Sequence, residues 1–310
     1  MTRCIIFGGS GYIGSMLARG LAESGSFGEI VLADLHPLPG PLPPRIRFVP
    51  CDIRGPIAPH VVAADAAWIF NFATAHPARG RGTQEYFDTN LYGARNVCAF
   101  AERIGCPNLF FASSTAVYGP AAGPAHEDTP KYPETPFAVS KVCAELIHEV
   151  WLKSAPGRRL IVVRPASVYG PGGGGEVGGM IRALRRRLLL LPGPAATPCS
   201  FAYIYGLLES FEFALARREP LLVFNYAEPE ALTLGFLAQS LRQYLAVRAL
   251  VVPRPALPAL HLPGPPPWIE PARLKQLGFG FRYDFARSLT HWRSLMPGDF
   301  QRGHAPGIPG

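Results

Sequence analysis

The sequence predicts an α/β fold built on a mostly parallel sheet. Up to about residue 165, short apolar runs rich in β-branched residues alternate with segments of helical periodicity. These runs are continuously apolar, as in strands that are buried on both faces. Regular alternation of strands and helices is typical of doubly wound parallel sheets. Beyond residue 165 the pattern is less regular, so we expect a smaller C-terminal lobe there.

Seven of the apolar runs are expected to be strands. They occupy residues 4–7, 30–34, 46–52, 68–74, 108–114, 160–167 and 221–226. Two of the intervening segments carry apolar residues at helical spacing, which predicts helices. One helical face is formed by Ile13, Leu17 and Leu21, and another by Val142, Leu146, Ile147 and Val150.

Length and composition limit the class of protein. No run of the 310 residues approaches the ~20 apolar residues that a membrane helix needs. Residues 1–7 are a poor signal peptide, because their apolar stretch ends at Gly8. The six cysteines include no Cys-x-x-Cys pair and no cluster at metal-ligand spacing. We therefore expect a cytoplasmic protein with no metal site and no membrane partner.

The net charge of +8 raises the question of a polyanionic partner. Only four of the thirty basic residues are lysine, and the dense cluster consists of Arg182, Arg185, Arg186 and Arg187. Arginine forks suit phosphate groups, so a small anionic ligand explains this cluster as well as a nucleic acid does. A solvated helix face is the plainer alternative. Since no aromatic residues are interleaved with the arginines, we expect no nucleic-acid partner.

A glycine motif follows the first predicted strand directly and opens a helix. It reads Gly8-Gly9-Ser10-Gly11-Tyr12-Ile13-Gly14. Gly8 permits a tight turn, Gly11 lets a pyrophosphate approach the backbone, and Gly14 lets helix and strand pack closely. The N-terminus of the helix supplies free N–H donors for the phosphates. The motif predicts a dinucleotide site, and with it a Rossmann-type doubly wound sheet.

Carboxylates at two strand ends indicate which dinucleotide binds. Asp34 ends the second predicted strand, where a carboxylate accepts from a ribose 2′-hydroxyl and repels a 2′-phosphate. NAD is therefore expected rather than NADP. Asp52 and the backbone of Ile53, at the end of the third predicted strand, are expected to meet the adenine amino group.

Further motifs run nearly from end to end of the chain. They are Gly8-x-x-Gly11-x-x-Gly14, Asp52-Ile53-Arg54, Phe72-Ala73-Thr74, Asn90-x-x-Gly93-x-x-Asn96, Ser113-Ser114-Thr115-Ala116-Val117-Tyr118-Gly119, Phe137-x-x-x-Lys141 and Arg164-Pro165-Ala166-Ser167-Val168-Tyr169-Gly170-Pro171. In this order they resemble the extended short-chain dehydrogenase/reductase family, the NAD-dependent nucleotide-sugar epimerases and dehydratases. The resemblance implies an NAD-binding domain over 1–165 and about 200–230. It also implies a substrate-binding lobe over about 166–199 and 231–310.

The resemblance also implies a set of site residues. Catalysis would involve Ser114, the position of Phe137, and Lys141. The cofactor would be held by Gly8, Gly11, Tyr12, Ile13, Gly14, Asp34, Asp52, Ile53, Phe72, Ala73, Thr74, Asn90, Lys141, Pro165 and Val168. The substrate, a nucleotide-activated sugar, would meet Ser114, Thr115, Ser167, Arg182 and Arg185. Family members commonly form homodimers, here through helices near 90–104 and 137–153.

Phe137 stands where the family places a catalytic tyrosine. A phenyl ring has no ionisable oxygen, and losing a positioned proton-transfer group costs on the order of 10²–10⁴-fold in rate. Three accounts remain open: a substitution made to trap a substrate, a natural chain with another proton acceptor, and a protein that binds without turnover. Tyr132 is a nearby tyrosine, but Phe137 fits the family register without a gap.

The residues beside Ser114 narrow the expected reaction. Dehydratases of this family usually place Asp-Glu where this chain has Thr115-Ala116. Without that extra acid and base, we expect oxidation and reduction at C4 of the sugar, as in a 4-epimerase, impaired by Phe137. The alternatives are a catalytically silent NAD-binding regulatory or scaffold protein and an NAD-dependent reductase of a ketosugar or another carbonyl.

Overall fold

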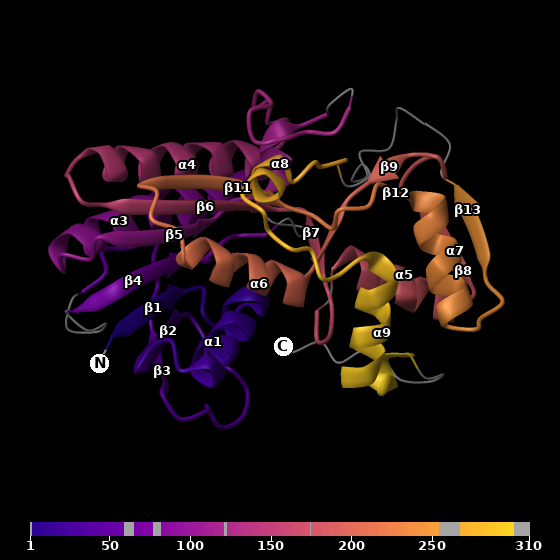
Figure 1. Ribbon diagram of the computed structural model, residues 1–310, viewed down its shortest axis with the longest axis horizontal. Coiled ribbons are helices and arrows are strands. Elements are labelled where there is room, and N and C mark those ends of the chain that lie inside the picture. The colour runs from indigo at the N-terminus through magenta and orange to yellow at the C-terminus, as the bar shows by residue number, and fades with distance from the viewer. Residues whose placement is uncertain are drawn as a thin grey trace. The chain divides into compact units, whose positions relative to one another are not determined.

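The computed structural model describes residues 2–58, 65–76, 82–120, 123–173, 175–253 and 267–300 (Figure 1). The chain divides into two compact units. The first consists of Met1–Gly119, Pro130–Arg164 and Phe211–Phe224, and the second of Pro120–Thr129, Pro165–Ser210 and Asn225–Gly310. Residues 254–266 and 301–310 of the predicted substrate lobe lie outside the described residues.

The first unit holds the large sheet and its helices. Its strands are β1 (Arg3–Phe7), β2 (Glu29–Asp34), β3 (Ile46–Pro50), β4 (Ala66–Asn71), β5 (Asn108–Ala112), β6 (Arg159–Pro165) and β11 (Leu221–Tyr226). Its helices are α1 (Tyr12–Ser24), α2 (Thr83–Tyr86), α3 (Gly93–Arg103) and α4 (Pro136–Lys153). A π-helix, η1 (Phe87–Tyr92), joins α2 to α3, and a 3₁₀ turn, η2 (Thr115–Tyr118), follows β5.

The seven strands have the order β11-β6-β5-β4-β1-β2-β3. Strands β1 to β6 pair in parallel, and Phe7 of β1 lies between Ala33 of β2 and Asn71 of β4. The chain proceeds from β1 to one side through β2 and β3 and then to the other side through β4, β5 and β6. This reversal beside β1 confirms the predicted Rossmann-type doubly wound sheet, and such a reversal is where open α/β sheets bind ligands.

Both faces of the sheet are buried, as the continuously apolar runs predicted. Phe7, Phe111 and Trp151 belong to the cluster that α3 and α4 cover. On the other face, Phe110 packs against Phe211 of α6 (Ile204–Leu215), with 4.8 Å between ring centroids.

Several strands end earlier than predicted. β3 stops at Pro50, β4 at Asn71 and β5 at Ala112. The polar or small residues that follow them therefore lie in loops at the carboxyl edge of the sheet. The expected strand 160–167 is interrupted at Ala166, whose N–H donates to Tyr226 O at 2.9 Å. After this break, β7 (Ser167–Tyr169) leaves the large sheet and pairs with β10 (Phe201–Tyr203) in a separate two-stranded sheet.

The apolar stripe predicted on α4 lies partly on the surface. Leu146 is 52% exposed and Val150 is 67% exposed, whereas Lys141, Glu145 and His148 are buried. The polar residues on the inward side bond to one another and to the backbone. Ile147 of the same stripe packs against the core, so the stripe marks a face that the described residues cover only in part.

The second unit holds the remaining elements. They are β7 (Ser167–Tyr169), α5 (Glu176–Arg185), β8 (Leu188–Leu191), β9 (Pro198–Cys199), β10 (Phe201–Tyr203), β12 (Leu232–Thr233), α7 (Leu234–Tyr244), β13 (Leu250–Pro253), α8 (Ala272–Gln276), α9 (Phe285–Leu295) and the 3₁₀ turn η3 (Pro297–Phe300). Its strands form two-stranded pairs, β7 with β10, β9 with β12, and β8 with β13. Within the described ranges, no helix combines the length and apolarity needed to cross a membrane.

Candidate functional site

The glycine turn between β1 and α1 can be built only from glycines at two positions. Gly8 has φ +73°, and a Cβ on it would lie 2.4 Å from Ala73 N. A Cβ on Gly14 would lie 2.4 Å from Gly8 O. Both substitutions would push the turn away from the strand ends. Sequence reasoning gave these two glycines the roles of turn and close packing, and the geometry agrees with them.

The start of α1 suits a diphosphate group. Gly11 precedes the helix with no side-chain cap, and Tyr12 and Ile13 form its first turn. A Cβ on Gly11 would meet only Gly8 O, at 3.1 Å. The hydroxyl oxygen of Ser10 is buried and has no partner among the described residues. Uncapped amides and a spare hydroxyl fit an anion, so this turn fits the diphosphate of a dinucleotide.

Ser10 was absent from the predicted cofactor residues. Its position inside the glycine motif is the signal that could have identified it.

Asp34 lies at the rim of the same turn. Its Oδ2 accepts from the N–H of Ser10 at 2.9 Å, and its Oδ1 accepts from the N–H of Leu35 at 2.7 Å. The carboxylate is therefore fixed against the glycine turn, and each oxygen keeps a second acceptor site. This arrangement fits ribose hydroxyls, as expected for NAD, and is unfavourable for a 2′-phosphate.

The loop after β3 is held by residues that sequence reasoning did not assign. The Asp52 carboxylate receives a two-pronged bond from Arg54, which lowers the pKa of Asp52. Asn96 Nδ2 donates to Ile53 O at 2.8 Å, and a Cβ on Gly93 would lie 2.4 Å from Ile53 Cδ1. Much of the Asn-x-x-Gly-x-x-Asn motif thus serves to position the segment that was expected to meet adenine.

Asn90 connects the loop after β4 to α4. Its Oδ1 accepts from Thr74 Oγ1 at 3.0 Å and from the N–H of Ala75 at 2.9 Å. Its Nδ2 donates to Ser140 Oγ at 2.8 Å, and Ser140 Oγ donates to Phe137 O at 2.7 Å. The expected polar role of Asn90 therefore takes the form of a brace between Phe72-Ala73-Thr74 and the helix that carries Phe137.

Lys141 is buried at the end of β5. Its Nζ donates to Ala112 O at 2.8 Å and lies 5.0 Å from the ring centre of Phe111. Burial lowers the pKa of Lys141 to about 7, with Glu145 acting in the opposite direction. Lys141 is therefore not a solvated surface lysine. An amine of this pKa can gain or lose a proton near neutral pH.

Ser114 and Thr115 lie in the turn beyond β5. Ser114 Oγ accepts from the N–H of Ala116 at 3.2 Å and so caps η2. Its hydroxyl proton remains for another acceptor. The side chain of Thr115 is buried.

Phe137 occupies the first turn of α4, which Thr135 caps by accepting from the N–H of Ala138 at 3.1 Å. The ring belongs to a small cluster with Ala75, Tyr86 and Ala116. Since Ala116 lies in η2, the ring lies beside the turn that Ser114 caps. The His76 ring stacks on Phe137 at 5.9 Å, and the Tyr86 ring meets it edge-on at 6.1 Å. One helical turn separates Phe137 from the buried Lys141.

A charged network continues along α4 behind Lys141. Glu145 accepts two bonds from Arg164, at 2.9 and 2.8 Å, and one from Lys131 at 2.6 Å. Arg164 Nη1 also donates to Tyr118 Oη at 2.9 Å. These cations hold the pKa of Glu145 low, although burial works against them. The spacing of four residues between Lys141 and Glu145 was the available sequence signal, and it was missed.

The remaining predicted residues belong to the second unit. Ser167 and Val168 pair with Phe201 and Ala202 in the β7/β10 ladder, directly after Pro165. A hydrogen bond from Ser167 lowers the pKa of Glu176, but burial outweighs it and raises that pKa overall. Ser167 is therefore already engaged by a carboxylate.

The two predicted substrate arginines lie on α5. Arg185 donates to the backbone carbonyls of Gly298 and Asp299. Arg182 is half-buried and lies along its own helix, where a Cβ on Gly178 would be 3.5 Å from Arg182 Nη1.

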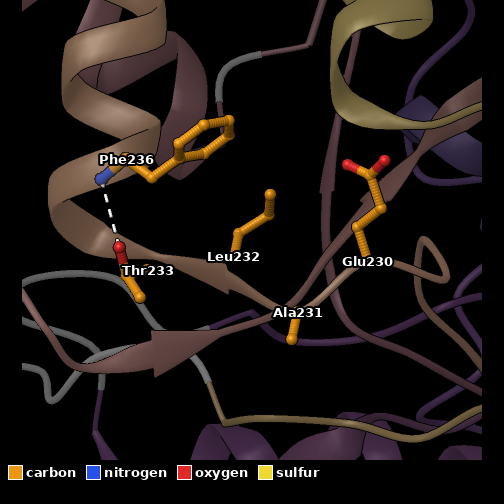
Figure 2. A pocket seen from close by; sticks show the side chains of 5 residues that line it. All are labelled: Glu230, Ala231, Leu232, Thr233 and Phe236. Atoms are coloured by element: carbon orange, nitrogen blue, oxygen red, sulfur yellow. Dashed lines mark hydrogen bonds between the residues drawn. The ribbon is translucent and has the colours of Figure 1, made fainter.

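A cavity of about 510 Å³ opens beside β12 in the second unit. It is lined by Glu230, Ala231, Leu232, Thr233 and Phe236. Figure 2 shows the Glu230 carboxylate and the Phe236 ring on opposite sides of Leu232. Thr233 Oγ1 accepts from the N–H of Phe236 at 3.2 Å. None of the residues predicted to bind cofactor or substrate lines this cavity.

The chain is similar in sequence to a known family and to several known proteins. The model of the NAD dependent epimerase/dehydratase family matches residues 4–201. An N-acetyl-alpha-D-glucosaminyl-diphospho-ditrans,octacis-undecaprenol 4-epimerase of Escherichia coli O157:H7 is 26% identical over 92% of this chain and 80% of its own length. A UDP-glucose 4-epimerase of Lactobacillus helveticus is 27% identical over 57% of this chain and 54% of its own length. The chain thus spans about half the length of that epimerase.

The fold has close structural neighbours. The UDP-glucuronic acid 4-epimerase of Bacillus cereus, in complex with UDP-glucuronic acid and NAD, has a TM-score of 0.81. It is 19% identical over 96% of this chain and 99% of its own. This likeness concerns the fold. The family match covers most of the chain and confirms the resemblance inferred from the motifs. The chain therefore belongs to the NAD-dependent epimerase/dehydratase family, and its cofactor is NAD.

Proposed function

We propose that this protein binds NAD and a sugar carried on a diphosphate, and that its site is organised for oxidation and reduction at C4 of that sugar, with proton transfer impaired at Phe137. One observation carries the proposal. Lys141 and Ser114 lie at the carboxyl end of β5 in a supported network, while the ring beside them lacks the oxygen that a proton transfer requires.

The protein's own residues would divide the work as follows. The glycine turn and Asp34 would hold the diphosphate and adenosine ribose of NAD, which supplies a reversible hydride acceptor when bound. Lys141 would hold the second ribose, and the Ser114 hydroxyl would donate a hydrogen bond to the sugar oxygen. The Phe137 ring cannot take the proton from that oxygen, so oxidation of the sugar is slow.

The turn after β5 favours epimerisation over dehydration. Thr115 and Ala116 carry no carboxyl group, and eliminating water from a sugar needs an added acid or base there. Thr115 is buried in η2, so its side chain cannot replace one.

The substrate's carrier has two candidates. A nucleotide is the carrier predicted from the family resemblance, and UDP-glucose 4-epimerases are among the relatives. A relative that matches most of the chain is named for a sugar on undecaprenyl diphosphate. Both carriers present a diphosphate, which the arginines of α5 suit. We propose the nucleotide sugar as the first substrate to test and the polyprenyl-linked sugar as the second.

We also propose that the protein forms a homodimer in the cytoplasm through α3 and α4. The exposed apolar residues Leu146 and Val150 on α4, and Tyr92 just before α3, support this interface. Covering such side chains stabilises association.

A catalytically silent NAD-binding protein is the second candidate. The packing of Phe137 against His76 and Tyr86 favours this candidate, because these contacts give the phenyl ring a structural role that does not involve a hydroxyl group.

Assays of wild type and Phe137→Tyr separate these two candidates. Each protein would be supplied with UDP-glucose and, separately, with a polyprenyl-diphosphate sugar, and the C4 epimer would be measured by chromatography. Epimerisation that rises on the order of 10²-fold or more in the variant supports an impaired epimerase. A Phe137→Leu variant is the control for altered packing. No gain in Phe137→Tyr, with NAD still bound, would refute the idea that only the hydroxyl is missing.

A further inference from the structure

We propose that the outward face of the β8/β13 ribbon docks on the surface of an anionic phospholipid membrane. The two strands pair in parallel beside α5 and α7 in the second unit (Figure 1). No residue of this ribbon belongs to the proposed active site. No membrane partner was expected from the sequence, because no run of it is long and apolar enough to span a bilayer, but a docking surface does not require a spanning segment.

The register of the ribbon gathers aliphatic side chains on one face. Leu188 pairs with Leu250, and Leu190 pairs with Val252. Residues that pair across neighbouring strands point to the same side of a sheet, so these four side chains share a face. Leu188 is 48% exposed, and Leu190 and Leu250 are each 64% exposed.

The opposite face of β8 is the one that packs on the protein. Leu189 and Leu191 alternate with the exposed leucines and are almost fully buried. The strand contacts α5 and α7. The exposed leucines are therefore not a consequence of a loosely packed ribbon, since the same strand is well buried on its other side.

Arginines collect at one end of this apolar face. Arg186 and Arg187 directly precede β8, and Arg248 lies two residues before the start of β13. Because the strands are parallel, both begin at the same end, and the Leu250 N–H donates to Arg187 O at 3.0 Å. Arg242 reaches the same end, where its Nη1 donates to Ala249 O at 3.4 Å. Among the described residues, no carboxylate pairs with any of these four arginines.

A depression lies where the arginines meet the aliphatic face. It has a volume of about 590 Å³ and is lined by Arg242, Val247, Arg248, Ala249 and Leu250. Its charged lining consists of two arginines with no acidic residue. Such a site suits the phosphate of a lipid headgroup, and the adjacent leucines suit the acyl region below it.

Other binding partners would complement only part of this surface. A symmetric second copy would cover the leucines but would offer the arginines no anion, because the paired residues of this face and the four arginines include no carboxylate. A nucleic acid would neutralise the arginines but would leave the leucines without an apolar partner, and the face has no aromatic ring on which bases could stack. An anionic bilayer complements the charge and the aliphatic face together.

The docking itself is independent of the proposed function. One consequence does rest on it: a protein held on this surface would meet a sugar linked to a polyprenyl diphosphate at the membrane that contains it.

Vesicle flotation of the full chain tests the proposal. Wild type would be mixed with phosphatidylcholine vesicles and with vesicles of equal parts phosphatidylcholine and phosphatidylglycerol. Two patch variants would be compared, Leu188→Ser/Leu190→Ser/Leu250→Ser and Arg186→Gln/Arg187→Gln/Arg248→Gln. The matched control is Leu295→Ser/Arg287→Gln, which changes an exposed leucine and an exposed arginine on α9. Bound NAD and circular dichroism would show that each variant is folded.

We expect wild type and the control to float with the anionic vesicles and not with the neutral ones. Removing the arginines should weaken binding by about five-fold for each charge lost, and the leucine variant should lose binding even at low salt. Equal binding by wild type and both patch variants would overturn the proposal. So would a change in oligomeric mass of the patch variants without a change in flotation, since that would assign the face to contact between copies. Flotation measures binding to vesicles and does not require turnover, so the test is valid even if the protein is catalytically inactive.

Discussion

Two buried glutamates, one in each unit, behave in opposite ways. Glu145 on α4 is 1% exposed, and Glu228 in the second unit is 2% exposed. Arg164 and Lys131 hold the pKa of Glu145 below its usual value. Among the described residues, the Glu228 carboxyl accepts hydrogen bonds only from hydroxyl groups, Tyr169 at 2.7 Å and Ser288 at 2.6 Å, and burial raises its pKa to about 8.

The difference shows what burial of a carboxyl group requires. Hydroxyl donors stabilise a carboxylate less than a cation does, so without a cation the neutral acid is preferred. Glu228 Oε2 is buried with no partner among the described residues, which is consistent with a proton on that oxygen. Glu145, in contrast, is a fixed negative charge behind Lys141. The first unit thus keeps ions beneath its proposed active site, and the second keeps a neutral acid in its core.

The largest expected effect comes from removing the cation at Glu145. Arg164→Met should leave a buried carboxylate with only the half-exposed Lys131, at a cost of about 3–5 kcal/mol in the free energy of unfolding. Urea denaturation at neutral pH would measure it. The matched control is Glu145→Gln/Arg164→Met, which should recover much of the loss. A double variant as unstable as the single one would show that lost packing of the arginine, rather than the unpaired charge, dominates.

Glu228→Gln should have an effect that depends on pH. Because the folded-state pKa is raised from 4.5 to about 8, the folded protein binds more protons between these values, and wild-type stability falls as pH rises through this window. The variant should lack this fall, whose slope is at most about 1.4 kcal/mol per pH unit. Thermal unfolding at several pH values would reveal it. Parallel curves for the two proteins from pH 4.5 to 8 would contradict the assignment.

Lys141→Met should remove a pH dependence of stability whose sign is opposite to that at Glu228. The folded-state pKa of Lys141 is lowered to about 7 from 10.5, so the unfolded chain binds more protons between these values and wild-type stability rises with pH there. The penalty for burying the charged amine is complete below pH 7. The stability difference between variant and wild type should therefore shrink as pH increases. A difference that stays constant would mean that Lys141 keeps its charge when buried.

The smallest effect is expected at Lys131, whose side chain is 27% exposed. Water screens its attraction to Glu145, so Lys131→Met should cost about 1 kcal/mol or less. Urea denaturation beside Arg164→Met gives the comparison directly. A loss as large as that of Arg164→Met would mean that the two cations contribute equally. That result would contradict the expectation that the more deeply buried arginine contributes more.

Local steric demands made the glycine turn after β1 predictable from sequence. Gly8 and Gly14 are required by contacts within one βα turn, and Asp34 is required at the end of the next strand. The networks around Glu145 and Glu228 were not predicted. Their partners lie 19 residues away for Arg164 and 59 or 60 residues away for Tyr169 and Ser288. Only the folded chain shows that these polar residues are buried together.

The stripe on α4 and the leucines of β8 illustrate the converse. Apolar periodicity indicated the α4 helix correctly, yet its Leu146 and Val150 lie on the surface. The apolar run of β8 was not predicted to be a strand, and its Leu188 and Leu190 are exposed as well. A pattern of apolar residues identifies a face without indicating whether the same chain covers it.

A rapid-mixing experiment tests the central claim most directly. Protein loaded with NAD would be mixed with saturating UDP-glucose or polyprenyl-diphosphate sugar. The initial formation of NADH would be followed by absorbance in three proteins: wild type, Phe137→Tyr and Phe137→Tyr/Lys141→Met. If the site lacks only the phenolic oxygen, NADH should form on the order of 10²–10⁴-fold faster in Phe137→Tyr than in wild type, and the gain should disappear when Lys141 is also replaced. NADH formation in wild type as fast as in Phe137→Tyr would contradict the account.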